Sequence, residues 1–214
     1  MPVLCQRHPR GGLALCLLHQ RGDPELSDAG DAIFTTERLI VRPWGPGDLE
    51  AAFRMYSDAE VTHFLLGEPD TDVETTATRL RSAEQRSARG AGLGFWAIEE
   101  RDSGRVAGAV ILKPLGDTEE IEVGYHLARD SWGKGIATEA AEGALRHGFT
   151  TVGLDRIVAV VRPDNPRSLR VIAKLGMRLE GRRHHYGSDL EYFALGRDEW
   201  QARQNHEGGT AAAG

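Results

Sequence analysis

A glycine-containing stretch from Asp130 to Glu142, DSWGKGIATEAAE, contains the residues best suited to bind a phosphate. Glycine costs about 1 kcal/mol inside a helix, so Gly133 and Gly135 must serve the approach to the helix formers that follow. The first N–H groups of a helix have no partner within it, and the helix dipole favours an anion there. The stretch therefore predicts a phosphate-binding loop, with a simple turn as the alternative. Lys134 either adds charge to such a site or is only solvated.

Two well-known phosphate loops do not fit these residues. The pattern G-x-x-x-x-G-K-S/T fails because Lys134 is followed by Gly135. The dinucleotide-binding pattern needs a third glycine where Thr138 stands. Another class of phosphate carrier is expected.

The strand predicted just before this loop, Glu119 to Leu127, alternates between two faces. One face carries Ile121, Val123, Tyr125 and Leu127, and the other carries Glu120, Glu122, Gly124 and His126. A carboxylate and an imidazole on one face can transfer protons close to a bound phosphate carrier. Since His126 lies close to the loop, we expect it to have a structural role.

The elements that position these residues follow from hydrophobic periodicity. Apolar residues at helical spacing run from Leu49 to Tyr56, and Thr71 with Glu74 predicts a capping box for a second helix. The remaining expected elements are strands at 39–43, 95–99, 106–112, 156–161, 177–180 and 190–195, and helices at about 138–150 and 167–175. This order predicts a mixed sheet with helices on both faces.

Length and composition exclude several classes of protein. The 214 residues, 40% of them hydrophobic, suit a single domain, expected over 34–204. The net charge of −6, without a basic and aromatic cluster, argues against nucleic-acid binding. Nothing approaches the length of a membrane span, so no membrane partner is expected.

The two ends of the chain are poorly patterned. Residues 1–33 read as a poorly ordered extension, and 205–214 as a disordered tail. Cys5 and Cys16 lie in the extension and predict neither a disulfide framework nor a zinc site, which favours the reducing cytoplasm. The apolar run from Leu13 to Leu18 is shorter than a secretion signal usually needs. No metal site is expected.

Four stretches together resemble a known family, the GCN5-related N-acetyltransferases (GNAT), and within it the branch that acetylates ribosomal-protein N-termini. They are TERLIVRPW at 36–44, IEVGYHL at 121–127, WGKGIATEA at 132–140 and NPRSLRVIAKLGMRLEG at 165–181. The resemblance runs from about Phe34 to Trp200. It implies an α+β fold with a twisted, mostly antiparallel sheet of six to seven strands between helices.

The same resemblance implies acetyl-CoA as cosubstrate, with its pyrophosphate on the glycine loop. The implied donor-site residues are Val123, Trp132, Gly133, Lys134, Gly135, Ile136, Ala137, Thr138, Asn165 and Ser168. For Trp132, packing of the loop against the sheet is the favoured alternative. For Asn165 and Ser168 the alternative is capping of the helix that they precede and begin.

Three residues are candidates for catalysis. Glu122 matches the position of a catalytic glutamate in several relatives and would accept the amine proton directly or through water. The alternatives are an exposed strand carboxylate and a salt-bridge partner. The tyrosine that many relatives use as acid corresponds to Ile172 here. The resemblance to the ribosomal-protein branch, which carries a serine three residues after the asparagine, implies Ser168 as the acid for the leaving thiolate. His185, beside His184 and before Tyr186, is a further base candidate.

The sequence predicts an N-acetyltransferase that moves an acetyl group to a primary amine by direct attack in a ternary complex. Acidic residues near the first helix connection are consistent with a cationic acceptor, although such residues are often only solvated: Asp58, Glu60, Glu68 and Asp70. A protein N-terminus and a small amine both stay open, as does a homodimer. The alternatives are a CoA-binding regulatory module without catalysis and, less favoured, a nucleotide-binding protein.

Overall fold

A computed structural model of the chain describes residues 32–65, 67–87 and 92–211. The expected extension at 1–33 lies almost wholly outside the described residues. The strands are β1 (Phe34–Thr35), β2 (Leu39–Arg42), β3 (Gly94–Glu100), β4 (Val106–Pro114), β5 (Ile121–Leu127), β6 (Arg156–Val161), β7 (Arg178–His185) and β8 (Ser188–Gly196). The α-helices are α1 (Leu49–Tyr56), α2 (Ala59–Thr62), α3 (Val73–Ser87), α4 (Ile136–His147), α5 (Pro166–Lys174) and α6 (Arg197–Ala211).

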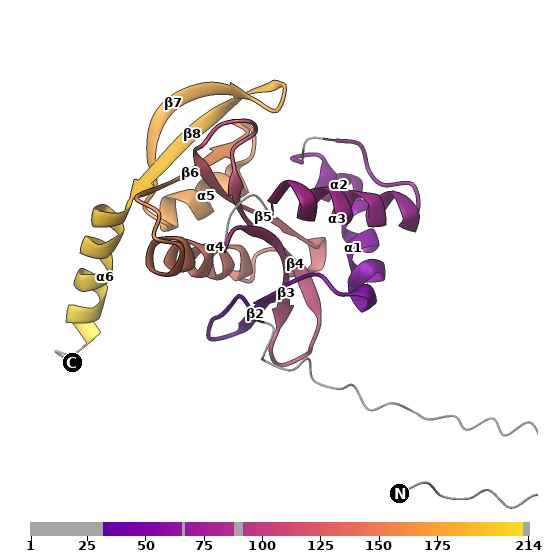
Figure 1. The fold of residues 1–214 in the computed structure, drawn as a ribbon, viewed down its shortest axis with the longest axis horizontal. Coiled ribbons are helices and arrows are strands. Elements are labelled where there is room, and N and C mark those ends of the chain that lie inside the picture. Colours follow the sequence, from indigo (N-terminus) through magenta and orange to yellow (C-terminus); the bar gives the residue numbers. More distant parts are fainter. Residues whose placement is uncertain (1–31, 66, 88–91, 212–214) are drawn as a thin grey trace, which may run out of the picture.

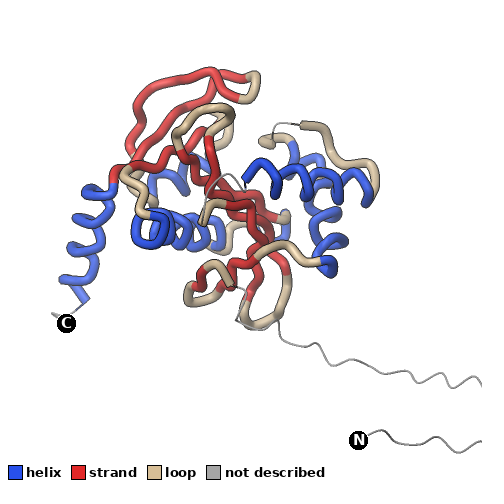
Figure 2. Tube along the Cα trace, in the orientation of Figure 1, coloured by secondary structure: helices blue, strands red, loops and turns tan. Residues whose placement is uncertain are grey.

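All eight described strands form one sheet in the order β1-β2-β3-β4-β5-β6-β8-β7. The described pairs are antiparallel except β5 with β6, which is parallel. Helices α1 to α3 lie on one side of the sheet, and α4 and α5 on the other (Figures 1 and 2). The mixed, mostly antiparallel fold is confirmed, with the short β1 as an eighth strand.

Each face of the sheet has its own apolar core. On the α4 side, the buried residues include Val123 of β5 and Ile136, Ala140 and Ala144 of α4, which recur at helical spacing. On the α1 side, Met55 and Tyr56 pack against Phe95 and Ile111 of the sheet. Because successive strand residues alternate between these two cores, the two faces of β5 differ in chemistry.

Three local predictions need correction. Helix α3 begins at Val73, so Asp72 and not Thr71 caps it; the Asp72 carboxylate accepts hydrogen bonds from the Thr75 N–H (2.7 Å) and hydroxyl (2.9 Å). The strands β7 and β8 are longer than expected, so both histidines at 184 and 185 lie in β7 and the turn is Tyr186-Gly187. Helix α6 runs across Asn205, where the sequence predicts the start of a disordered tail.

Candidate functional site

The site is built where two parallel strands part. Within the described residues, β5 and β6 pair at a single register position, Glu122 with Val158. Beyond Glu122 the edge of β5 that faces β6 therefore has no sheet pairing, and its backbone N–H and C=O groups can bind an extended ligand. The chain leaves both strands at this open end and starts a helix after each. Ligands of α/β sheets bind in such a position, beyond the carboxyl ends of parallel strands.

The glycine loop forms the first of these helix starts. Gly133 has a φ of 76° and Gly135 a φ of 81°, values in the left-handed region that favours glycine. Gly135 is the N-cap of α4 and has no side chain to offer, so the next N–H groups of the helix stay available. Gly133, Lys134 and Gly135 are exposed, and Ile136 anchors the helix in the core. The left-handed glycines and the helix start without a side-chain cap are thus present, and the binding of a phosphate there stays a prediction.

Arg38 fixes the loop from the turn between β1 and β2. Its guanidinium donates to the Lys134 carbonyl (3.0 Å) and pairs with the Glu139 carboxylate of α4 (2.6 Å). Glu139 also accepts hydrogen bonds from the Thr36 hydroxyl and the Arg38 N–H. An open groove of about 660 Å³ adjoins these residues along the exposed side of α4. Arg38 lies within the TERLIVRPW stretch, but its pattern alone did not predict this contact.

Trp132 and Arg167 join the two helix starts. The Trp132 indole N–H donates to the Leu127 carbonyl (3.0 Å), which holds the loop against the end of β5. The Arg167 guanidinium of α5 lies over the indole, 4.4 Å from the ring centre. Trp132 therefore packs the loop on the sheet. This is the role that the sequence analysis favoured over a direct contact with the cofactor.

The second helix start carries Asn165 and Ser168. The Asn165 side chain accepts a hydrogen bond from the Ser168 N–H (3.0 Å), so Asn165 is the N-cap of α5. The Ser168 hydroxyl lies 2.8 Å from the Tyr125 hydroxyl of β5. Burial raises the pKa of Tyr125 to about 12, against the opposing effect of the Ser168 hydrogen bond. The sequence placed Tyr125 only on the strand face that carries Ile121, Val123 and Leu127.

Glu122 lies on the opposite face of β5 and is almost fully buried, with 7% of its surface exposed. The Lys113 ammonium of β4, directly across the strand pair, contacts its carboxylate at 2.5 Å. The Tyr186 hydroxyl donates to the same oxygen and accepts from Lys113 (2.8 Å). Burial lowers the pKa of Lys113, but its pairing with Glu122 and Tyr186 outweighs this and leaves it raised. Glu122 is thus an enclosed, partnered carboxylate and not a solvated one.

Tyr186 reaches this cluster from the turn of the β7–β8 hairpin. Its φ of 53° is the only positive value of a described residue other than glycine, and its hydroxyl also accepts from the Gly116 N–H (3.2 Å). The preceding residue, His185, instead stacks on Tyr192, with 6.4 Å between the ring centres. The structure therefore brings Tyr186 to Glu122, whereas the contact of His185 is with β8.

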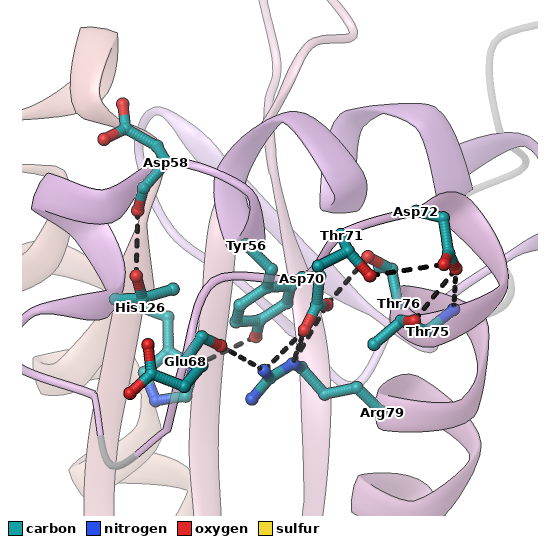
Figure 3. Close-up of polar contacts among 11 residues, drawn as sticks. Tyr56, Asp58, Glu68, Asp70, Thr71, Asp72, Thr75, Thr76, Arg79 and His126 are labelled. Carbon is teal, nitrogen blue, oxygen red and sulfur yellow. Dashed lines mark hydrogen bonds and ion pairs between the residues drawn. The ribbon is translucent and has the colours of Figure 1, made fainter.

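The acidic residues expected near the acceptor have partners of their own. Asp70 is 4% exposed and binds the Arg79 guanidinium (2.5 Å) and the Thr76 hydroxyl (2.8 Å), as Figure 3 shows. Asp58 caps α2 through the Glu60 N–H (2.8 Å), and the Glu60 carboxylate pairs with Arg129 (2.6 Å). Asp70 is therefore a buried, paired carboxylate that fixes the connection between α2 and α3, and a cationic acceptor near these residues stays a prediction.

His126 belongs to the same structural network. Its Nδ1 lies 2.9 Å from the Tyr56 hydroxyl of α1 (Figure 3), and the Arg79 guanidinium lies 5.0 Å from the centre of the Tyr56 ring. Burial, followed by the charges of Arg79 and Lys113, lowers the pKa of His126 to about 3. The imidazole is therefore neutral in the folded protein near pH 7, which fits the structural role expected from the sequence.

This shift predicts a pH dependence of stability. A histidine in the unfolded chain has a pKa near 6.5, whereas His126 in the folded protein has a pKa of about 3. Between these two pH values the unfolded state therefore binds one proton more than the folded state. Stability should therefore be full above pH 7 and fall as the pH drops toward 4, by up to about 1.4 kcal/mol per pH unit. Urea unfolding at pH 7 and pH 5 checks this against His126→Gln, which should lose less. Equal losses in both proteins would contradict it.

Among residues 32–65, 67–87 and 92–211, no group of three or more His, Cys, Asp or Glu side chains is arranged to hold a metal ion. In the same ranges, no helix combines the length and apolar character of a membrane span.

The residues missed by sequence reasoning are those whose contacts depend on register or on a turn. Lys113 lies one residue beyond the predicted strand at 106–112, so its pairing with Glu122 could not be read from periodicity. The position of Tyr186 depends on the lengths of β7 and β8, and both strands were predicted too short. Tyr125 stood on the predicted face, but no sequence signal indicated that its hydroxyl meets Ser168.

Comparison with known proteins finds one matching family model and several similar proteins. A family model described as acetyltransferase (GNAT) domain matches residues 38–178. YoaA of Bacillus subtilis, an uncharacterized N-acetyltransferase, is 32% identical over 168 residues, covering 75% of this chain and 92% of YoaA. Spermidine N(1)-acetyltransferase of Escherichia coli is 27% identical over 147 residues, covering 68% of this chain and 75% of that protein. RimJ of Mycobacterium smegmatis in complex with CoA-disulfide has a TM-score of 0.60 and 29% identity, covering 75% and 83% of the two chains.

The chain belongs to the GNAT acetyltransferase family. The family model spans well over half of the sequence and includes the glycine loop, β5 and α5. The chain is accordingly an acyltransferase, and the family implies acetyl-CoA as its donor. The resemblance predicted from four short stretches is confirmed.

Proposed function

We propose that this chain transfers the acetyl group of acetyl-CoA to a primary amine that attacks the thioester directly in a ternary complex. The observation that carries the proposal is the parting of β5 and β6 at Glu122. This separation leaves a gap between β5 and β6. The starts of α4 and α5 lie at the open end of the gap, and the enclosed Glu122 carboxylate lies where the two strands still pair. An extended donor and a proton acceptor are needed at just these two ends.

The donor half of the proposal rests on the loop and on the unpaired edge of β5. The N–H groups after Gly135 would hold the pyrophosphate, with Lys134 beside them. The pantetheine arm would follow the unpaired edge from Val123 onward, because its amides can pair with backbone N–H and C=O groups. The likeness to a RimJ structure that contains CoA-disulfide supports this assignment.

The acceptor half rests on Glu122. An amine is largely protonated near pH 7 and must lose a proton before or during its attack, and Glu122 would accept that proton directly or through water. Because Lys113 and Tyr186 already hold the carboxylate, an incoming amine would have to share or displace their contacts. The likeness to a protein named spermidine N(1)-acetyltransferase supports an amine acceptor of this kind.

Ser168 is proposed to supply the proton to the leaving thiolate. Replacing Ser168 by alanine should lower kcat by about tenfold to a hundredfold and leave the affinity for acetyl-CoA nearly unchanged. The Asn165 cap uses the backbone N–H of Ser168, so the start of α5 survives the change. Initial-rate kinetics with calorimetric binding checks both halves. A turnover number equal to that of the wild type would limit Ser168 to its place in the helix.

Calorimetric titration separates the proposal from its two alternatives. We expect acetyl-CoA to bind at one site per chain and ATP not to compete with it. Tight binding of ATP at the same site would favour a nucleotide-binding protein. Binding of acetyl-CoA without turnover of any amine would favour the regulatory module. Thermal shift with each ligand provides an independent reading, because a ligand that binds only the folded state raises its stability.

A further inference from the structure

The hydroxyls of Tyr125 and Ser168 form a pair on the side of β5 away from Glu122. Their oxygens are 2.8 Å apart, and the Tyr125 hydroxyl also has the Ser168 carbonyl at 3.4 Å. Tyr125 lies three residues beyond Glu122, the last position at which β5 pairs with β6. Ser168 lies in the first turn of α5, whose start is held by Asn165. The pair therefore spans the gap between the unpaired edge of β5 and the second helix start.

The hydrogen bond between the two hydroxyls has two possible directions. Either oxygen can be the donor at the short distance, and the Tyr125 hydroxyl can also donate to the Ser168 carbonyl. When Tyr125 donates to the serine oxygen, the serine keeps its own proton for a second partner. Among the contacts of the described residues, no protein acceptor takes that proton. The raised pKa of Tyr125 keeps the phenol protonated through the neutral range, so its donation does not vary with pH there.

We propose that Tyr125 is a positioning residue for acetyl transfer: its hydroxyl holds Ser168 so that the Ser168 O–H points at the sulfur atom of the donor. The inference rests on the proposed function and deepens it. When the nitrogen–carbon bond forms and the carbon–sulfur bond breaks, the electron pair moves onto sulfur. The amine proton goes to Glu122. The thiolate takes the Ser168 proton, Ser168 regains one from water, and Glu122 releases its proton to water, so that the net proton transfer is from nitrogen to sulfur.

The test needs no knowledge of the amine acceptor. The thiol of bound CoA is titrated by the ultraviolet absorbance of its thiolate in the wild type, Ser168→Ala, Tyr125→Phe and the double variant. A hydroxyl that donates to sulfur stabilises the thiolate, so Ser168→Ala should raise the pKa of the bound thiol by about one. Tyr125→Phe should give a smaller rise in the same direction. The double variant should match Ser168→Ala, because Tyr125 acts through Ser168.

Tyr192→Phe provides a matched control, since it deletes another buried phenol, one that donates to Glu120. It should leave the thiol pKa unchanged. Turnover gives a second reading: Tyr125→Phe should lower kcat about threefold to tenfold, with the KM for the amine and the affinity for CoA preserved. Melting temperatures of all variants exclude loss of the fold as the cause.

The outcomes are distinguishable. A wild type that does not bind CoA would overturn the proposed function and this inference together. CoA binding with an unchanged thiol pKa in Tyr125→Phe would overturn the inference alone. Additive effects in the double variant would also overturn it, because Tyr125 would then act independently of Ser168.

Discussion

Replacing Gly135 by aspartate should abolish the binding of acetyl-CoA. Gly135 has a φ of 81°, and a Cβ placed on it would lie 3.3 Å from the Arg38 guanidinium that holds the loop. The new carboxylate would also carry negative charge to the place where a phosphate is expected. Together these effects should weaken binding by about a hundredfold or more, which corresponds to about 3 kcal/mol. Isothermal titration with acetyl-CoA measures the loss.

Gly153→Asp is the matched control for this variant. Gly153 also has a φ of 81°, and nothing lies within 4 Å of a Cβ built on it, so the backbone strain and the added charge are comparable. Gly153 ends the helical segment Gly148–Val152, which continues from the C-terminal end of α4. We expect Gly153→Asp to lose some stability and to keep its affinity for acetyl-CoA. Micromolar affinity retained by Gly135→Asp would refute the donor site at the glycine loop.

Replacing Glu122 by glutamine should cost both activity and stability. Loss of a general base lowers kcat by about a hundredfold to ten-thousandfold. The change also leaves the Lys113 ammonium, a mostly buried charge, without its carboxylate. Removing one member of such a pair should lower the free energy of unfolding by about 2 kcal/mol, somewhat less than for a fully buried pair. Steady-state kinetics and urea unfolding measure the two losses separately.

A second variant separates these effects. Combining Glu122→Gln with Lys113→Met removes both charges and puts an apolar side chain of similar length beside Tyr186. We expect most of the lost stability to return while kcat stays low. Recovery of turnover along with stability would show that Glu122 serves the fold and not the reaction. Lys113→Met alone removes the charged partner of Glu122 and leaves the Tyr186 hydroxyl on its carboxylate. The effect of this variant on the KM for amines shows whether Lys113 competes with the acceptor.

Periodicity and short-range chemistry predicted most of the fold. The alternation of residues 119–127 gave β5 its two faces, and the glycines at 133 and 135 placed the start of α4 close to its observed position. These features depend on neighbours in the chain, so they can be read from it. The cap of α3 was misplaced by one residue because Thr71 and Asp72 are both good caps, and only the helix start decides between them.

The surroundings of the site could be predicted less well, because they depend on contacts between distant residues. Glu122 was identified as a candidate, but its partners are 9 and 64 residues away in the chain. Asp70 read as a surface charge, although Arg79 and Thr76 enclose it. In both cases the sequence gives the chemical groups, and the sheet register and the hairpin turn decide which groups meet.

A paired measurement of thiol release and acetylated amine tests the proposed acetyl transfer most directly. The purified protein is mixed with acetyl-CoA and a panel of basic peptides, peptides with N-terminal Ala or Ser, and polyamines. We expect at least one amine to be acetylated in an amount equal to the thiol released, and we expect Glu122→Gln combined with Lys113→Met to suppress both. Thiol release without any acetylated amine would contradict the proposed acetyl transfer. So would the absence of thiol release with every amine of the panel when acetyl-CoA is bound.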